Sequence, residues 1–68
     1  MTKAMKTKAI AAINEYREKT GNTMLVHDWG FHHYGEDYTI LEAEDNKFNL
    51  YRVNHNSIYN DFVETFSI

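Results

Sequence analysis

Residues 2–20 carry their apolar side chains at helical spacing, and this segment constrains the fold more than any other part of the chain. On a helical wheel of about 100° per residue, one side of the segment collects Met5, Ala9, Ala12, Ile13 and Tyr16,. Gly21, followed by Asn22, is the residue type expected where a helix ends in a left-handed conformation. A helix with one apolar stripe needs a second layer to cover it, so the rest of the chain has to supply that layer.

The middle of the chain alternates apolar and polar residues, as β-strands do. The apolar run at residues 23–29 predicts a first strand,. Residues 37–43 and 47–53 predict the two arms of a β-hairpin, joined by the turn residues "EDN",. Gly30 and Gly35 flank a segment that we expect to form a loop or an irregular edge between strands.

The last part of the chain has two interpretations. Ile58, Phe62 and Phe66 recur every four positions, which predicts a short helix over residues 57–66,. The alternative is a fourth strand over residues 61–68, because apolar residues also alternate there, although imperfectly. The helical interpretation gives an α-β-β-β-α order. It predicts a single α+β domain over residues 1–68, with a three-stranded antiparallel sheet and helices on one face.

The chain has only 68 residues and no cysteine, which excludes a disulfide framework, a thiolate nucleophile and a cysteine-ligated zinc site,. A domain this small needs unusually good packing, and its ten Trp, Tyr and Phe residues can provide it,. No stretch approaches the roughly 20 apolar residues of a membrane span, and no signal peptide is evident. We therefore expect a cytoplasmic protein that does not bind membranes.

Positive charge is concentrated near the N-terminus. Residues 1–19 contain five Lys or Arg against two Glu, whereas residues 20–68 contain two against eight Asp or Glu. We interpret this as a basic helix lying on an acidic sheet; the alternative is a charged surface that steers a partner into place. The acidic body would repel phosphate over a Debye length of about 8–10 Å, so we do not expect nucleic acid as a partner. A small nucleic-acid-binding regulator that uses the basic helix is the alternative hypothesis.

The segment "HDWGFHHYGED", residues 27–37, gathers three of the four histidines with three acids. Its spacing matches neither the H-E-x-x-H motif nor a Cys/His finger, and neighbouring side chains of an extended strand point to opposite faces. We therefore predict no metal site and no cofactor, with histidine-based metal binding as an alternative. Ser57 and Ser67 lie in no G-x-S-x-G elbow, and a chain this short leaves little room for a substrate cleft, so we predict that it is not an enzyme.

The hypothesis that remains is a non-enzymatic protein-binding module. Tyrosine and tryptophan are the residue types that carry interface energy, and we expect at least two of the rings of Trp29, Phe31 and Tyr34 to be exposed. The predicted partner-binding residues are Trp29, Phe31, His33, Tyr34, Glu36 and Asp37. Small acidic proteins of this kind include bacteriophage-encoded inhibitors of host enzymes or defence nucleases, an analogy of size and composition alone. The expected partner is another protein, and a second copy of the chain, forming a homodimer, is a further candidate.

Overall fold

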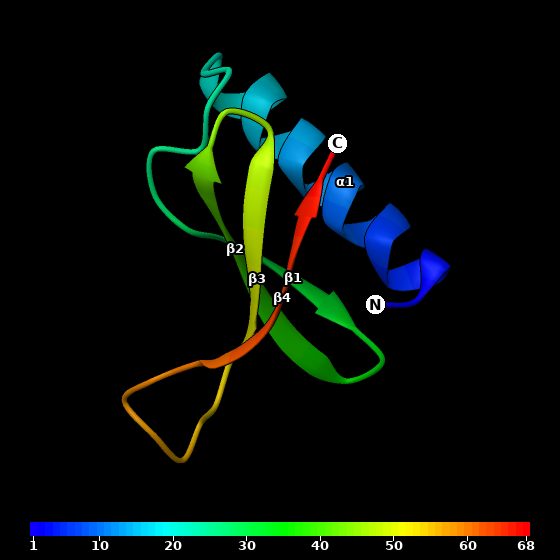
Figure 1. Ribbon diagram of the computed structural model, residues 1–68, viewed down its shortest axis with the longest axis vertical. Helices are drawn as coiled ribbons and strands as arrows, with labels where there is room; N and C mark the ends of the chain where they lie inside the picture. The colour runs from blue at the N-terminus through cyan, green and yellow to red at the C-terminus, as the bar shows by residue number, and fades with distance from the viewer.

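The computed structural model describes residues 1–68 as one helix and one four-stranded sheet (Figure 1). The elements are α1 (Lys3–Thr20), β1 (Trp29–His33), β2 (Glu36–Glu44), β3 (Lys47–Arg52) and β4 (Asp61–Ser67). The strands lie in chain order, and each strand is antiparallel to its neighbours. α1 crosses one face of the sheet, so the other face has no covering layer (Figure 1).

Both ends of α1 are capped, and the cap at Gly21 is the one that the sequence predicts. The Thr2 hydroxyl accepts a hydrogen bond from the Met5 amide at 3.1 Å, which satisfies one of the free N–H groups of the first turn,. Gly21 adopts a left-handed conformation with φ 74°, and its amide donates to the Arg17 carbonyl at 2.9 Å,. α1 is the only helix, and it lacks the combination of length and apolar character that a membrane-spanning helix needs.

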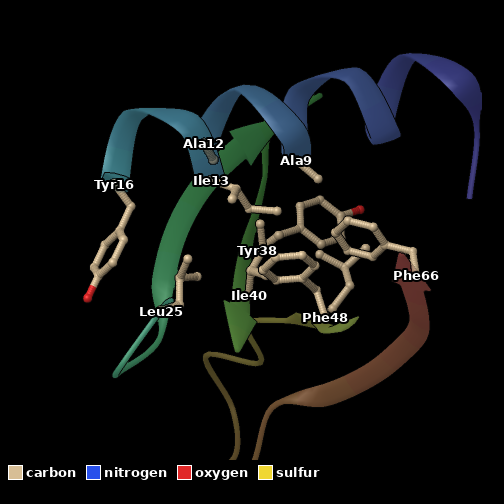
Figure 2. Close-up of a cluster of buried hydrophobic side chains, with 10 residues drawn as sticks. Ala9, Ala12, Ile13, Tyr16, Leu25, Tyr38, Ile40, Phe48 and Phe66 are labelled. Atoms are coloured by element: carbon tan, nitrogen blue, oxygen red, sulfur yellow. The ribbon is translucent and has the colours of Figure 1, made fainter. Parts of the chain in front are cut away.

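The core lies between α1 and the covered face of the sheet (Figure 2). The prediction that α1 buries Ile13 and Tyr16 is confirmed, and both side chains are fully buried. Ala9 and Ala12 lie on the same side of α1, and their small side chains allow the helix backbone to approach the strands. The sheet contributes Tyr38, Ile40, Phe48, Leu50 and Phe66, and the connection between α1 and β1 contributes Leu25.

The predicted strand at residues 23–29 is wrong, because β1 begins only at Trp29. The amides of Leu25 and Val26 donate to side chains, to Glu42 and to the Tyr16 hydroxyl, instead of to a neighbouring strand. The segment after Gly30, predicted as a loop or an irregular edge between strands, belongs to the regularly paired edge strand β1 instead. It continues through Tyr34 and Gly35 into β2, and their φ angles of 48° and 76° make the two-residue turn that matches the twist of a hairpin,.

The predicted C-terminal helix at residues 57–66 is also wrong, and with it the three-stranded sheet. Residues 61–67 form the fourth strand, β4, which was the alternative interpretation. A β-bulge explains the misleading spacing of the phenylalanines: Leu50 pairs with Glu64 but Tyr51 pairs with Phe62, so Val63 is the extra residue,. The bulge places Phe66 on the covered face, 6% exposed, and Phe62 on the bare face, 58% exposed.

The predicted hairpin is confirmed as β2 and β3, and a buried carboxylate joins it to the rest of the fold. Oε1 of Glu42 accepts a hydrogen bond from the Leu25 amide, and Oε2 accepts one from the Asn46 amide, both at 2.9 Å. Leu25 belongs to the connection before β1, and Asn46 lies in the turn between β2 and β3. Glu42 therefore satisfies backbone amides from two irregular segments at once, which explains why an acid occupies a buried position,.

Replacing Glu42 by Gln is expected to destabilise the fold by about 1–3 kcal/mol, because one acceptor oxygen becomes an NH₂ group that faces a backbone N–H. The measurement is the free energy of unfolding from urea titration. Glu44→Gln is the matched control, since Glu44 is exposed on the same strand. Equal stability of the two variants would contradict the structural role of the buried carboxylate.

Candidate functional site

The bare face of the sheet carries a row of side chains across its three longest strands. Thr39 pairs with Tyr51, and Tyr51 pairs with Phe62, so the three side chains stand on the same face,. The rings of Tyr51 and Phe62 meet edge to face, with centroids 5.7 Å apart,. Leu41, two residues beyond Thr39, is exposed on this face as well.

The loop between β3 and β4, residues 53–60, adds two large apolar side chains to this face. Ile58 is 89% exposed and Tyr59 is 74% exposed. The loop projects beyond the end of the sheet, away from α1 (Figure 1, orange). Its own side chains hold its backbone: Asn54 Oδ1 accepts the amide of residue 56 at 3.0 Å, and Ser57 Oγ accepts the amide of Tyr59 at 3.1 Å,. The loop thus presents apolar groups to solvent in a defined conformation.

These residues surround a hollow of about 480 Å³. Leu41, Tyr51, Ile58 and Tyr59 form its apolar part, and we call these four residues together with Phe62 the open-face surface. Asp28, from the connection before β1, also lines the hollow, and its Oδ2 accepts a hydrogen bond from the Thr39 hydroxyl at 3.2 Å. The lining includes no Lys and no Arg, so the charge beside the apolar residues is negative.

Asp37 joins the loop to the first hairpin through two histidines. One carboxylate oxygen contacts Nδ1 of His32, and the other lies 3.2 Å from Nε2 of His55 in the loop. The remaining two histidines lie elsewhere, with His27 edge-on to the Tyr16 ring and His33 buried. The four histidines therefore do not converge, and no three His, Asp or Glu side chains are arranged to hold a metal ion.

The six predicted partner-binding residues do not form one surface. Trp29 and Phe31 are half-buried against the core and His33 is buried, because alternate residues of β1 face α1. The expectation that two of the three rings are exposed is wrong: only Tyr34, in the turn, is exposed, to 90%, and its ring lies against that of His33 with centroids 4.4 Å apart. Glu36 is exposed beside this turn, and Asp37 lies on the bare face. Their role in partner binding stays a prediction.

The open-face surface was missed because the sequence of the tail was interpreted as a helix. A helix would have gathered Ile58, Phe62 and Phe66 on one buried stripe. As a strand after a loop, the same segment leaves Ile58 and Phe62 in solvent and buries only Phe66. The alternation of residues 62, 64, 66 and 68 could have identified the strand, but not the bulge that turns Phe62 to the bare face.

The basic residues of α1 make no ion pair with the sheet. The only ion pair among side chains of α1 joins Glu15 to Lys19 within the helix, at 3.6 Å. Lys3, Lys6 and Lys8 are exposed. Arg17 contacts the sheet without an ion pair. It donates a hydrogen bond to Asn46, and its guanidinium lies above the Phe48 ring. The predicted packing of a basic helix on an acidic sheet is therefore not achieved through salt bridges.

The end of the loop is fixed by Asp61, the first residue of β4. Its carboxylate accepts a hydrogen bond from the Arg52 guanidinium at 2.7 Å and a longer one from the Asn54 amide group at 3.5 Å. The hydrogen bond from Arg52, followed by the one from Asn54, lowers the pKa of Asp61 below its ordinary value of 3.8. The same hydrogen bond to Asp61 raises the pKa of Arg52.

Replacing Asp61 by Asn is expected to change how the thermal stability of the fold depends on pH. A carboxyl group whose pKa is lowered by folding stabilises the fold above its unfolded pKa, and this contribution is lost as pH falls through the folded pKa. The parent is therefore expected to unfold at a higher temperature than Asp61→Asn at pH 7, with the difference shrinking below about pH 4. Circular dichroism melts at pH 7 and pH 3 measure it. A difference that does not change with pH would show that Asp61 acts only through its size and shape.

Two surfaces of the molecule thus differ in chemical character. The open-face surface is apolar with a negative border, whereas the solvent-exposed side of α1 is basic. No known protein family, characterised protein or solved structure matches the chain.

Proposed function

We propose that the protein is a non-enzymatic protein-binding module and that the open-face surface is where its partner binds. The observation that carries the proposal is the exposure of Ile58 and Tyr59 on a loop whose conformation is held by its own hydrogen bonds. Exposing large apolar side chains beside Phe62 and Leu41 is unfavourable in water, and contiguous apolar patches of this kind mark interaction sites,.

The surroundings of the open-face surface favour a basic partner. Asp28 and Asp37 lie on the same side of the sheet, at the border of the apolar centre. An apolar centre with a charged border is the usual anatomy of an interface. The carboxylates would raise the rate of association with a basic surface, while Ile58 and Tyr59 would slow dissociation. Inhibition of a larger enzyme, the role of many small phage-encoded proteins, requires no more than such a surface placed over the target.

Replacing Ile58 and Tyr59 together by Ser is expected to weaken partner binding by about 2 kcal/mol or more, roughly 30-fold in Kd, because two apolar anchors are lost. The partner is first isolated from extracts of the producing cells with the tagged full chain. It is then purified, and its Kd for the parent and the variant is measured by calorimetry. The melting temperature of the variant is expected to be unchanged, since both side chains are exposed.

Two further variants locate the binding surface. Tyr34→Ala removes the most exposed ring on the predicted partner-binding segment. Tyr34 lies in the turn between β1 and β2 and does not line the hollow of the open-face surface, so the variant is expected to leave Kd unchanged. Charge reversal of Lys3 and Lys6 alters the basic side of α1 without touching the open-face surface. If this charge reversal abolishes binding while the Ile58 and Tyr59 double variant binds like the parent, the basic helix is the functional surface and the proposal is wrong.

We also propose that the chain self-associates through β4. This strand ends the sheet, so one side of its backbone is unpaired, and it contains neither the Lys nor the Pro that commonly protect edge strands,. Its two acids, Asp61 and Glu64, are paired with Arg52 and with the N-terminal ammonium group. Antiparallel pairing of β4 with the β4 of a second copy would join two sheets across a two-fold axis. Sedimentation at micromolar concentration is expected to show a dimer. A monomer at every usable concentration would remove this proposal.

A further inference from the structure

The outer edge of β1 is free, because β1 pairs only with β2. α1 runs beside this edge (Figure 1). Two hollows of about 540 and 340 Å³ lie between the helix and the strand. The first hollow is lined by residues from the N-terminal half of α1 and by His32, His33 and Tyr34. The second is lined by residues further along α1 and by Gly30, Phe31 and His32. Lys8 and His32 line both hollows, so the two hollows adjoin, and we call them together the α1–β1 groove.

The α1–β1 groove is as long as a short extended peptide segment. The helix residues that line it are spaced by three and four positions and so form a single stripe along one flank of α1: Ala4, Thr7, Lys8, Ala11, Ala12 and Glu15,. From residue 4 to residue 15 this stripe is roughly 16 Å long at the helical rise of 1.5 Å. A β-strand of about five residues has the same length. Three of the six lining residues are alanines, which leave space for another backbone.

The backbone of β1 offers the hydrogen bonds that such a segment needs. The outer N–H and C=O groups of an edge strand are unpaired, and they bind an extended chain by adding it to the sheet. β1 contains no Pro, Lys or acidic residue that would discourage an added strand. Small residues on α1 and unpaired backbone on β1 face each other across the groove.

The charges that line the α1–β1 groove indicate what its occupant carries. Glu15 is paired with Lys19, and His32 is paired with Asp37. Lys8 has no ion-pair partner, although it lines both hollows. The charge left uncompensated in the groove is therefore positive, and it lies midway along the stripe.

We infer that the α1–β1 groove binds an extended acidic segment of another protein, which adds to the sheet as a strand beside β1 and places a carboxylate at Lys8. This site lies on a different side of the molecule from the open-face surface, and it does not depend on that surface having a partner. The β1 strand of a second copy contains no acid that could bind Lys8, so a second copy paired through β1 does not fit the groove.

The test uses the full chain, immobilised, to select binders from a library of random linear octapeptides. The selected peptides are expected to be enriched in Asp and Glu among residues of high β-propensity. Lys8→Glu is expected to weaken their binding at least tenfold, measured by fluorescence polarisation with synthetic peptides. Lys6→Glu makes the same charge change at an exposed lysine that does not line the groove, and it is expected to change Kd less than twofold.

Two further measurements separate strand addition from simple charge attraction. Alternate residues of an added strand direct their amides to β1. A peptide N-methylated at this set of residues is therefore expected not to bind, whereas a peptide N-methylated at the other set is expected to bind like the unmodified peptide. Ala11→Phe, which fills the groove, is expected to block binding. Asn14→Phe introduces the same ring at an exposed helix position that does not line the groove, and it is expected to have no effect.

The inference is overturned if no selected peptide distinguishes the parent from Lys8→Glu, or if peptide binding shifts the amide resonances of residues 58–62 and not those of residues 30–34. It is also overturned if the parent self-associates and Lys8→Glu alone abolishes this, since the occupant of the groove would then be a second copy, paired through its acidic β4 strand. The proposed function of the open-face surface is unaffected by any of these results.

Discussion

One helix has to stabilise four strands, and the division of the sheet into a covered and a bare face follows from this imbalance. α1 can cover only one face of the sheet, so the strands divide their side chains between a small core and a bare face (Figure 1). Alternation along β3 shows the division plainly, with Phe48 and Leu50 buried on one side and Tyr51 on the other. A core of ten side chains contributes little stability beyond what the fold needs. A buried carboxylate, Glu42, therefore also takes part in holding the irregular segments together.

The sequence correctly predicted the elements whose apolar pattern is long and whose ends contain residue types that favour a cap or a turn. α1 repeats its apolar spacing over several turns and ends at Gly21, whose conformation needs no tertiary contact to favour it,. The β2–β3 hairpin combines two alternating arms with a turn that contains Asn46, a residue type that tolerates the positive φ found there,. In both cases local preference and tertiary packing agree.

The remaining elements depended on interactions that a sequence pattern does not reveal. The bulge at Val63 shifts the phase of alternation inside β4, so Phe62 and Phe66 imitate one stripe of a helix although they lie on opposite faces. Tyr34 carries a positive φ that glycine or asparagine usually adopts, so the turn between β1 and β2 was not recognised and β1 was predicted too early,. The candidate site was misplaced for the same reasons, since the segment between Gly30 and Gly35 was expected to leave the sheet and expose its rings.

The chain-order arrangement of the strands has a consequence for how the molecule folds. Each strand pairs with the strand that precedes or follows it, so no pairing requires two distant parts of the chain to meet first. The entropy lost in closing a loop grows with its length, and here the strand connections are two turns of two residues and one loop of eight,. Sheets usually fold slowly because their contacts join distant residues, but in this chain each hairpin joins neighbouring segments,. The strand pairings are therefore local, whereas the contacts of α1 with β3, β4 and the β2–β3 turn join more distant parts of the chain.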